Sequence, residues 1–199
     1  HLKSVEPSLS ASVAFEFFRA TTMPAFFVIA GWSAVASLRQ RSPGRFVSDR
    51  MLRLLVPLVT GIVLFGSVIK YIELSHGRDL GLDGFRLVDA LQVGFLEFFP
   101  RYLTHGGGEW LTWSHLWFLF YLFLITVLLL PALVRLARRA PCTRVPAAYA
   151  VYLPALPMAA LLVAFNGYWP YYPNLVTDWN NFGYYALCVA IGASIAAWP

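Results

Sequence analysis

Charged residues are scarce in this chain. Only 13% of its 199 residues are Asp, Glu, Lys or Arg, whereas 59% are hydrophobic and 17% are aromatic. An average soluble domain carries about a quarter charged residues, so too little polar surface remains here to cover a water-soluble globule. The composition therefore excludes an ordinary soluble domain and predicts a protein embedded in a lipid bilayer.

Cysteines and the common catalytic motifs are also few or missing. Two cysteines, Cys142 and Cys188, cannot form a disulfide framework. The sequence has no His/Cys/Asp/Glu spacing typical of a zinc or iron site, no G-x-S-x-G turn and no Walker-type glycine loop. We therefore expect no metal, no resident cofactor, no serine nucleophile and no nucleotide hydrolysis. Membrane topology explains the net charge of +5, so no nucleic-acid partner is expected.

Long apolar runs are what the chain has instead. A membrane span needs about 20 mainly apolar residues, and five runs qualify approximately, at 13–38, 52–72, 116–136, 145–165 and 182–198. Each must be helical because lipid offers no partner to an open sheet edge. Pro24, Pro57 and Pro131 predict helix kinks or helix starts. We expect one all-α, polytopic transmembrane domain over residues 1–199, truncated at both ends.

The arginines predict the orientation of these spans. Basic residues cluster in two loops, 39–50 and 137–144, which the positive-inside rule places in the cytoplasm. The segment 73–110 holds six acidic residues against three arginines, and 167–181 has no Lys or Arg, so both are expected outside. Residue 1 then lies on the outer side.

One part of the basic loop is a candidate anion site. Arg50 and Arg53 are three residues apart near a predicted helix start, so their side chains share a face, and Arg45 precedes them. Arginine presents a planar fork of donors to phosphate oxygens, which suits a polyphosphate ligand. Positive-inside topology and contact with anionic lipid are the alternative interpretation, which the spacing alone favours.

The outer side holds the other candidate groups. The segment 85–103 has apolar residues on one side and polar residues on the other, which predicts an amphipathic helix. His105 and Glu109 flank three glycines, in either a ligand site or a simple turn. His115 and Trp117 begin the third span, where the histidine is either functional or part of an interfacial aromatic belt. Glu16 and Arg19 share a helix face, as a structural pair or in a polar cavity.

Three blocks of sequence together resemble a known family. They are MPAFFVIAGWSAVASLRQ at 23–40, RFVSDRMLRLLVPLVTG at 45–61 and SHLWFLFYLFL at 114–124. In this order and with these separations they are similar to the acyltransferase 3 family of integral membrane proteins, especially its glucan-modifying protein C-like branch. The resemblance covers about residues 17–138, and the remaining spans match only in being apolar.

The resemblance implies an enzyme of about ten spans in a bacterial cytoplasmic (inner) membrane. Such an enzyme moves an acyl group from cytosolic acyl-CoA, a co-substrate, to a hydroxyl of a periplasmic or surface glycan. By analogy, Arg45, Arg50 and Arg53 would bind the CoA phosphates. A histidine would be the general base, and His1 and His115 are the candidates. Glu16, Arg19, His105, Glu109 and Trp117 would lie on the acceptor side. The alternative is a transporter or flippase of a glycan or lipid without acyl chemistry.

Overall fold

The computed structural model describes residues 9–81, 84–105, 110, 116–139, 152–165 and 178–196. Its elements are helices α1 (Leu9–Leu38), α2 (Pro43–Gly61), α3 (Ser67–Ser75), α4 (Phe95–His105), α5 (Trp117–Leu128), α6 (Leu130–Arg138), α7 (Ala155–Phe165) and α8 (Trp179–Ile195), a π-helical segment (Ile62–Gly66), and strands β1 (Arg78–Gly81) and β2 (Gly84–Leu87). The all-α prediction is confirmed, with one short antiparallel hairpin added.

Two helical stretches in the described residues are long and apolar enough to cross a membrane. They are Thr21–Leu38 within α1 and the continuous rod Pro43–Ser75, and α5 with α6 makes a third if the bent pair is one span. These correspond to the first three predicted spans. The fourth is described only as the short apolar helix α7, and the fifth corresponds to α8, which has 17 residues.

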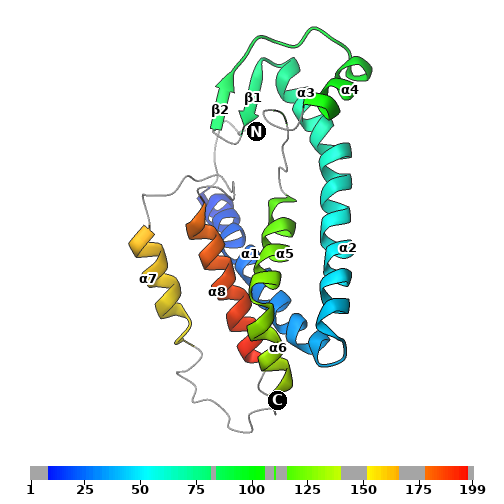
Figure 1. Cartoon of the computed structure of the whole chain (residues 1–199). Coiled ribbons are helices and arrows are strands. Elements are labelled where there is room, and N and C mark those ends of the chain that lie inside the picture. Colours follow the sequence, from blue (N-terminus) through cyan, green and yellow to red (C-terminus); the bar gives the residue numbers. More distant parts are fainter. Residues whose placement is uncertain are drawn as a thin grey trace.

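The rod made by α2, the π-helical segment and α3 extends well beyond a bilayer. Its 33 residues rise about 50 Å at 1.5 Å per residue, whereas the hydrocarbon core is about 30 Å thick. Between Arg53 and Lys70 the rod carries no charge, over a rise of about 25 Å. The rod therefore has its arginines near its first end and carries a small lobe at its other end (Figure 1).

The bend between α5 and α6 has a local cause. The two helices meet at 62°, and Pro131 occupies the start of α6. Proline has no N–H to continue the helical ladder, and its ring clashes with the carbonyl four residues earlier. The predicted proline effect is confirmed here, and the bend carries α6 toward the turn between α1 and α2, where Leu133 packs with Val35, Leu38 and Phe46.

Helices α1 and α8 pack with their backbones almost touching. A Cβ added to Gly192 would lie 1.8 Å from the carbonyl oxygen of Val28, and one added to Gly31 would lie 2.0 Å from that of Val189. Small residues of this kind allow membrane helices to approach closely, which is how they gain dispersion energy without a hydrophobic driving force. The interface continues into a core around Phe27, where the ring of Tyr185 stacks at 4.4 Å.

A small lobe, here called the outer lobe because the predicted orientation places it outside, consists of α3, the β1–β2 hairpin and α4. Lys70 is fully buried there, and its ammonium group contacts Asp79 at 2.5 Å, Glu73 at 3.3 Å and the Leu80 carbonyl at 3.1 Å. Phe98 and Tyr102 of α4 pack on Leu74. The predicted amphipathic helix over 85–103 is wrong in its first half: β2 reaches Leu87, and α4 begins only at Phe95, because residues 84–87 pair with 78–81 in the hairpin.

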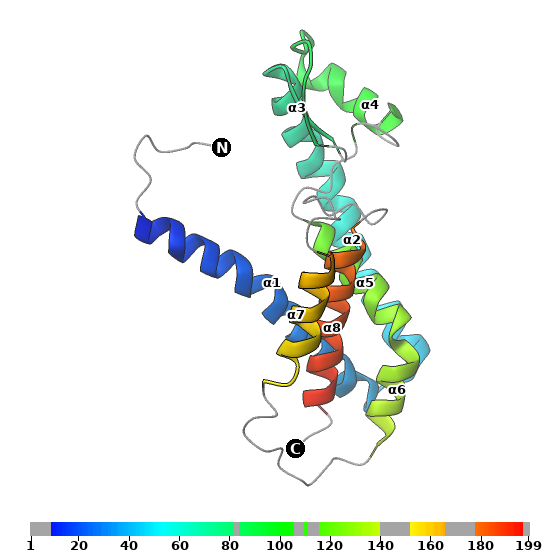
Figure 2. The ribbon, with the colours of Figure 1, turned by 90° about the vertical axis from the view of Figure 1, so that its left-hand side faces the viewer.

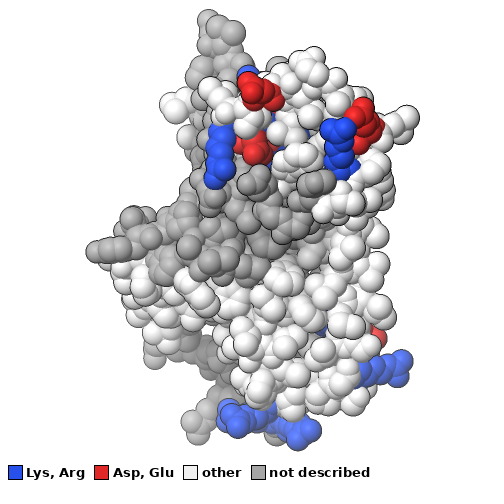
Figure 3. All heavy atoms as spheres, turned by 45° about the horizontal axis from the view of Figure 1, so that its top comes forward, with Lys and Arg blue, Asp and Glu red and all other residues white. Residues whose placement is uncertain are grey.

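Charge gathers at the two ends of the described molecule. Figure 3 shows basic side chains at one end, basic and acidic side chains over the outer lobe, and an uncharged region between them. The basic end combines the α1–α2 turn with the end of α6, so residues 137–139, the described part of the second predicted cytoplasmic segment, lie near the first. The first half of α1, with the exposed Phe17 and Phe18, projects away from the other helices (Figure 2).

Candidate functional site

A pocket of about 460 Å³ opens between the end of α1 and the beginning of α2. Each helix contributes one stripe at helical spacing, because residues three and four apart share a face. The α1 side and its following turn supply Ser33, Ala36, Ser37, Gln40 and Arg41, and the α2 side supplies Phe46, Asp49, Arg50, Arg53 and Leu54. The small α1 residues leave the space, and the arginines border it.

The start of α2 positions this stripe. Ser42 is the N-cap, its hydroxyl accepts a hydrogen bond from the Arg45 backbone N–H at 3.4 Å, and Pro43 follows in the first turn. Both features are typical of helix starts, since the cap satisfies an orphan N–H and proline has none to lose. The cap therefore determines where the helix begins, and with it the direction of the later side chains.

Arg50 lies half-buried in the pocket and is held by neutral groups. Its guanidinium donates to the Ser33 hydroxyl at 3.2 Å and lies 3.5 Å from the Ala30 carbonyl, both on α1. Its central carbon lies 5.2 Å from the centre of the Phe46 ring, a cation–π distance. No carboxylate among the described residues pairs with Arg50, so its positive charge stays available to a ligand.

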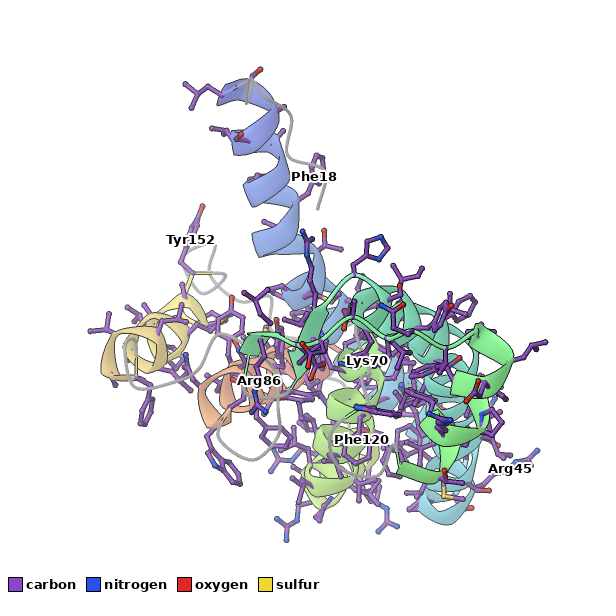
Figure 4. All side chains as sticks on the ribbon, turned by 90° about the horizontal axis from the view of Figure 1, so that it is seen from above. Phe18, Arg45, Lys70, Arg86, Phe120 and Tyr152 are labelled. Carbon is purple, nitrogen blue, oxygen red and sulfur yellow. The ribbon has the colours of Figure 1, made fainter. Side chains whose placement is uncertain are left out.

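The structure adds Arg41 to this cluster and leaves Arg45 outside the pocket lining. Arg41, in the turn before α2, pairs with Asp49 at 2.5 Å. Arg53 also lines the pocket. Arg45 is exposed, and Figure 4 shows its side chain pointing away from the other helices. The predicted partners Arg50 and Arg53 are thus brought together, while Arg41 takes the third place.

The pocket suits a phosphorylated ligand. Its lining carries three arginines and one aspartate, so its net charge is positive. Arg50 and Arg53 are near each other on one helix face and repel, and a ligand with several negative charges would relieve that repulsion. Ser37 and Gln40 add hydrogen-bonding side chains, while the buried Phe46 and Leu54 form an apolar wall.

The predicted catalytic and acceptor-side residues are only partly visible. His1, His115 and Glu109 lie outside the described residues. Glu16 and Arg19 belong to α1 and His105 ends α4, but their side chains are not described. Trp117 starts α5, with its ring 5.1 Å from Tyr121 and 5.4 Å from Tyr185. It therefore belongs to an aromatic cluster between α5 and α8.

Sequence reasoning missed a buried acid next to this cluster. Asp178 is 1% exposed, and the Tyr121 hydroxyl donates to its Oδ2 at 2.8 Å. It precedes α8 at the N-cap, yet its side chain does not cap the helix, and its Oδ1 has no hydrogen-bond partner within the described structure. Burial raises the pKa of Asp178, and the hydrogen bond from Tyr121 lowers it by less.

A signal for Asp178 existed but is ambiguous. An Asp a few residues before an apolar run is a common helix start, so the sequence alone favours a surface cap rather than a buried group. Only the approach of Tyr121 from α5, 57 positions away in the chain, reveals the pairing.

Comparison with known proteins identifies a family. The family model described as an acyltransferase domain (Acyl_transf_3) covers residues 3–199. No curated protein and no solved structure shows significant similarity to the chain.

Proposed function

This chain belongs to the acyltransferase 3 family, and from that premise we propose that it is a membrane-bound O-acyltransferase that uses acyl-CoA. The observation that carries the proposal is the pocket at the basic end, where Arg50 and Arg53 lie together with Arg41. In this proposal the three guanidinium groups bind the phosphates of the CoA portion, and the acceptor is a hydroxyl of a periplasmic or cell-surface glycan.

The charge distribution supports this direction of transfer. The pocket lies at the end that the positive-inside rule assigns to the cytoplasm, where acyl-CoA is available. The outer lobe lies at the opposite end of the rod that carries Arg50 and Arg53 (Figure 1). A donor bound on one side and an acceptor on the other require the acyl group to cross between them, which a helical membrane domain can allow along its interior.

The chemistry defines what the remaining residues must do. The acceptor oxygen attacks the thioester carbonyl, the C–S bond breaks, and the acceptor proton ends on the sulfur of free CoA. A group with a pKa near neutral must receive that proton, and donors must stabilise the oxyanion. We propose His115 or His1 as the base. His105, Glu109, Glu16, Arg19 and Trp117 remain candidates for the acceptor side.

Coenzyme A itself is the best probe of the pocket, because its phosphates are common to every acyl-CoA. With the full chain in nanodiscs of neutral lipid, we expect Arg53→Ala to weaken CoA binding by about tenfold or more, since hydrogen bonds to charged groups are worth about 1.5–3 kcal/mol. Arg45→Ala removes the same charge outside the pocket and should change affinity much less. Arg101→Ala, in the outer lobe, should have no effect.

Anionic lipid and transport are the competing explanations. If the arginines only contact lipid, Arg53→Ala and Arg45→Ala will weaken binding to anionic vesicles equally and leave CoA affinity unchanged. If the protein transports without chemistry, mass spectrometry of surface glycans from cells with and without the gene will show no ester difference. Either result would contradict the proposed function.

A further inference from the structure

The donor pocket contains its own negative charge, which the proposed function leaves unexplained. Asp49 lines the pocket beside Arg50 and Arg53, where a carboxylate would repel a phosphorylated ligand. Its side chain is 32% exposed, and that of its partner Arg41 is 38% exposed. Ion pairs this accessible to solvent contribute little to stability, so structural stabilisation alone is a weak reason for this acid.

Asp49 pairs with a different arginine from the one that its position on the helix favours. Arg53 follows Asp49 by four residues on the same helix, and an acid placed before a base at this spacing is the favoured helical pair. Asp49 nevertheless contacts Arg41, eight positions earlier in the turn between α1 and α2. The carboxylate thus draws a guanidinium from the turn to the edge of the pocket, while no described carboxylate forms an ion pair with Arg53.

The three arginines are therefore held in different ways. Arg50 is fixed by the Ser33 hydroxyl and the Phe46 ring, which leaves its charge uncompensated. Arg41 is neutralised by Asp49 at 2.5 Å. A phosphate that enters the pocket meets Arg50 and Arg53 directly, but it reaches Arg41 only by competing with Asp49. Because that pair is exposed, its exchange for a phosphate is readily reversible.

We infer that Asp49 is an internal competitor for the donor phosphates, which holds Arg41 when the pocket is unloaded and yields it when a CoA phosphate binds. The inference rests on the proposed function, since it assumes an anionic donor. It assigns Asp49 a role in setting donor affinity and in releasing CoA after transfer. A carboxylate that returns to Arg41 as the product leaves would speed that release.

The inference predicts a gain of binding when a charge is removed. In nanodiscs of neutral lipid at low salt, Asp49→Asn should bind CoA about three- to tenfold more tightly than the wild type, mainly through slower dissociation. The gain should shrink at high salt, because screening weakens exposed charges. Asp49→Glu keeps the charge and should stay near the wild type, and Asp49→Ala should reproduce the gain of Asp49→Asn.

Matched variants separate this role from others. Glu97→Gln removes an acid that is also paired with an arginine, Arg101, but lies in the outer lobe, and it should leave CoA affinity unchanged. In an Arg41→Gln background the gain from Asp49→Asn should be smaller, because no guanidinium remains to be released. In nanodiscs containing anionic lipid, a lipid phosphate that occupies the same pocket would lower CoA affinity in every variant with the wild-type arginines.

Two results would overturn the inference. A purely structural Asp49 predicts unchanged or weaker CoA binding in both Asp49→Asn and Asp49→Ala, with a lower melting temperature. If Arg53→Ala weakens CoA binding but Asp49→Asn does not strengthen it, Asp49 is not a competitor for the phosphates, although the pocket still binds the donor. Unchanged binding in Arg53→Ala would instead reject the proposed function itself.

Discussion

Replacing Gly192 by alanine tests the packing on which the bundle depends. The added Cβ would lie 1.8 Å from the Val28 carbonyl oxygen, and the obstacle is backbone rather than a movable side chain. Helices α1 and α8 must then separate by more than an ångström, which also opens the reciprocal contact at Gly31. Overpacking costs about 1–3 kcal/mol and sometimes more, and we expect about 3 kcal/mol here.

The melting temperature of the full chain in detergent provides the assay. For a protein of 150–250 residues, 1 kcal/mol corresponds to about 2–4 °C, so Gly192→Ala should lower the apparent melting temperature by about 6–12 °C at a fixed scan rate. The matched control is Gly44→Ala, in the first turn of α2, where an added Cβ meets nothing within 4 Å.

Alanine favours a helix over glycine by up to about 1 kcal/mol, so the Gly44→Ala control should melt at or slightly above the wild-type temperature. A Gly192→Ala variant that melts within 2 °C of the wild type would show that α1 and α8 are not packed backbone to backbone.

Three further predictions concern buried charges. The raised pKa of Asp178 means that the folded state holds this proton more tightly than the unfolded state. The resulting contribution to stability is complete below about pH 4 and is lost as the pH rises through the folded-state pKa. Asp178→Asn should therefore make the melting temperature depend less on pH over that range. Tyr121→Phe removes a donor that lowers this pKa and should extend the loss to higher pH, which the same melts would reveal. Asp79→Asn leaves the buried Lys70 with Glu73 as its only carboxylate partner among the described residues, and it should destabilise the outer lobe by about 1–3 kcal/mol, measured by proteolysis. The double variant with Lys70→Met should recover part of this loss. A double variant less stable than Asp79→Asn would contradict the prediction.

Much of the membrane architecture follows from the chain itself. Apolar runs near Thr21–Leu38 and within Pro43–Ser75 are predictable because a span must satisfy its own backbone and face lipid. The bend at Pro131 is predictable because proline interrupts the helical ladder locally. The predicted helix over 85–94 is wrong because an amphipathic pattern reports only on neighbouring residues. It does not indicate that Leu87 pairs with Arg78 in the hairpin.

The candidate site was predictable only within one element. Helical periodicity places Arg50 and Arg53 on one face whatever surrounds them, and the pocket contains both. The prediction also included Arg45, which is closer to Arg50 in the chain than Arg41 is. Helical periodicity does not indicate how the turn before α2 folds. The structure brings Arg41 to the pocket through Asp49 instead.

The sequence by itself determined that this protein is an all-α membrane protein with its arginines concentrated beside particular spans, because composition and periodicity act over neighbouring residues. Only the tertiary structure decided that Gly31 and Gly192 bring α1 against α8, that Tyr121 meets Asp178, and that Ser33 holds Arg50. Each of these contacts joins residues on different helices, and its existence depends on how the helices pack rather than on the spacing along any one of them.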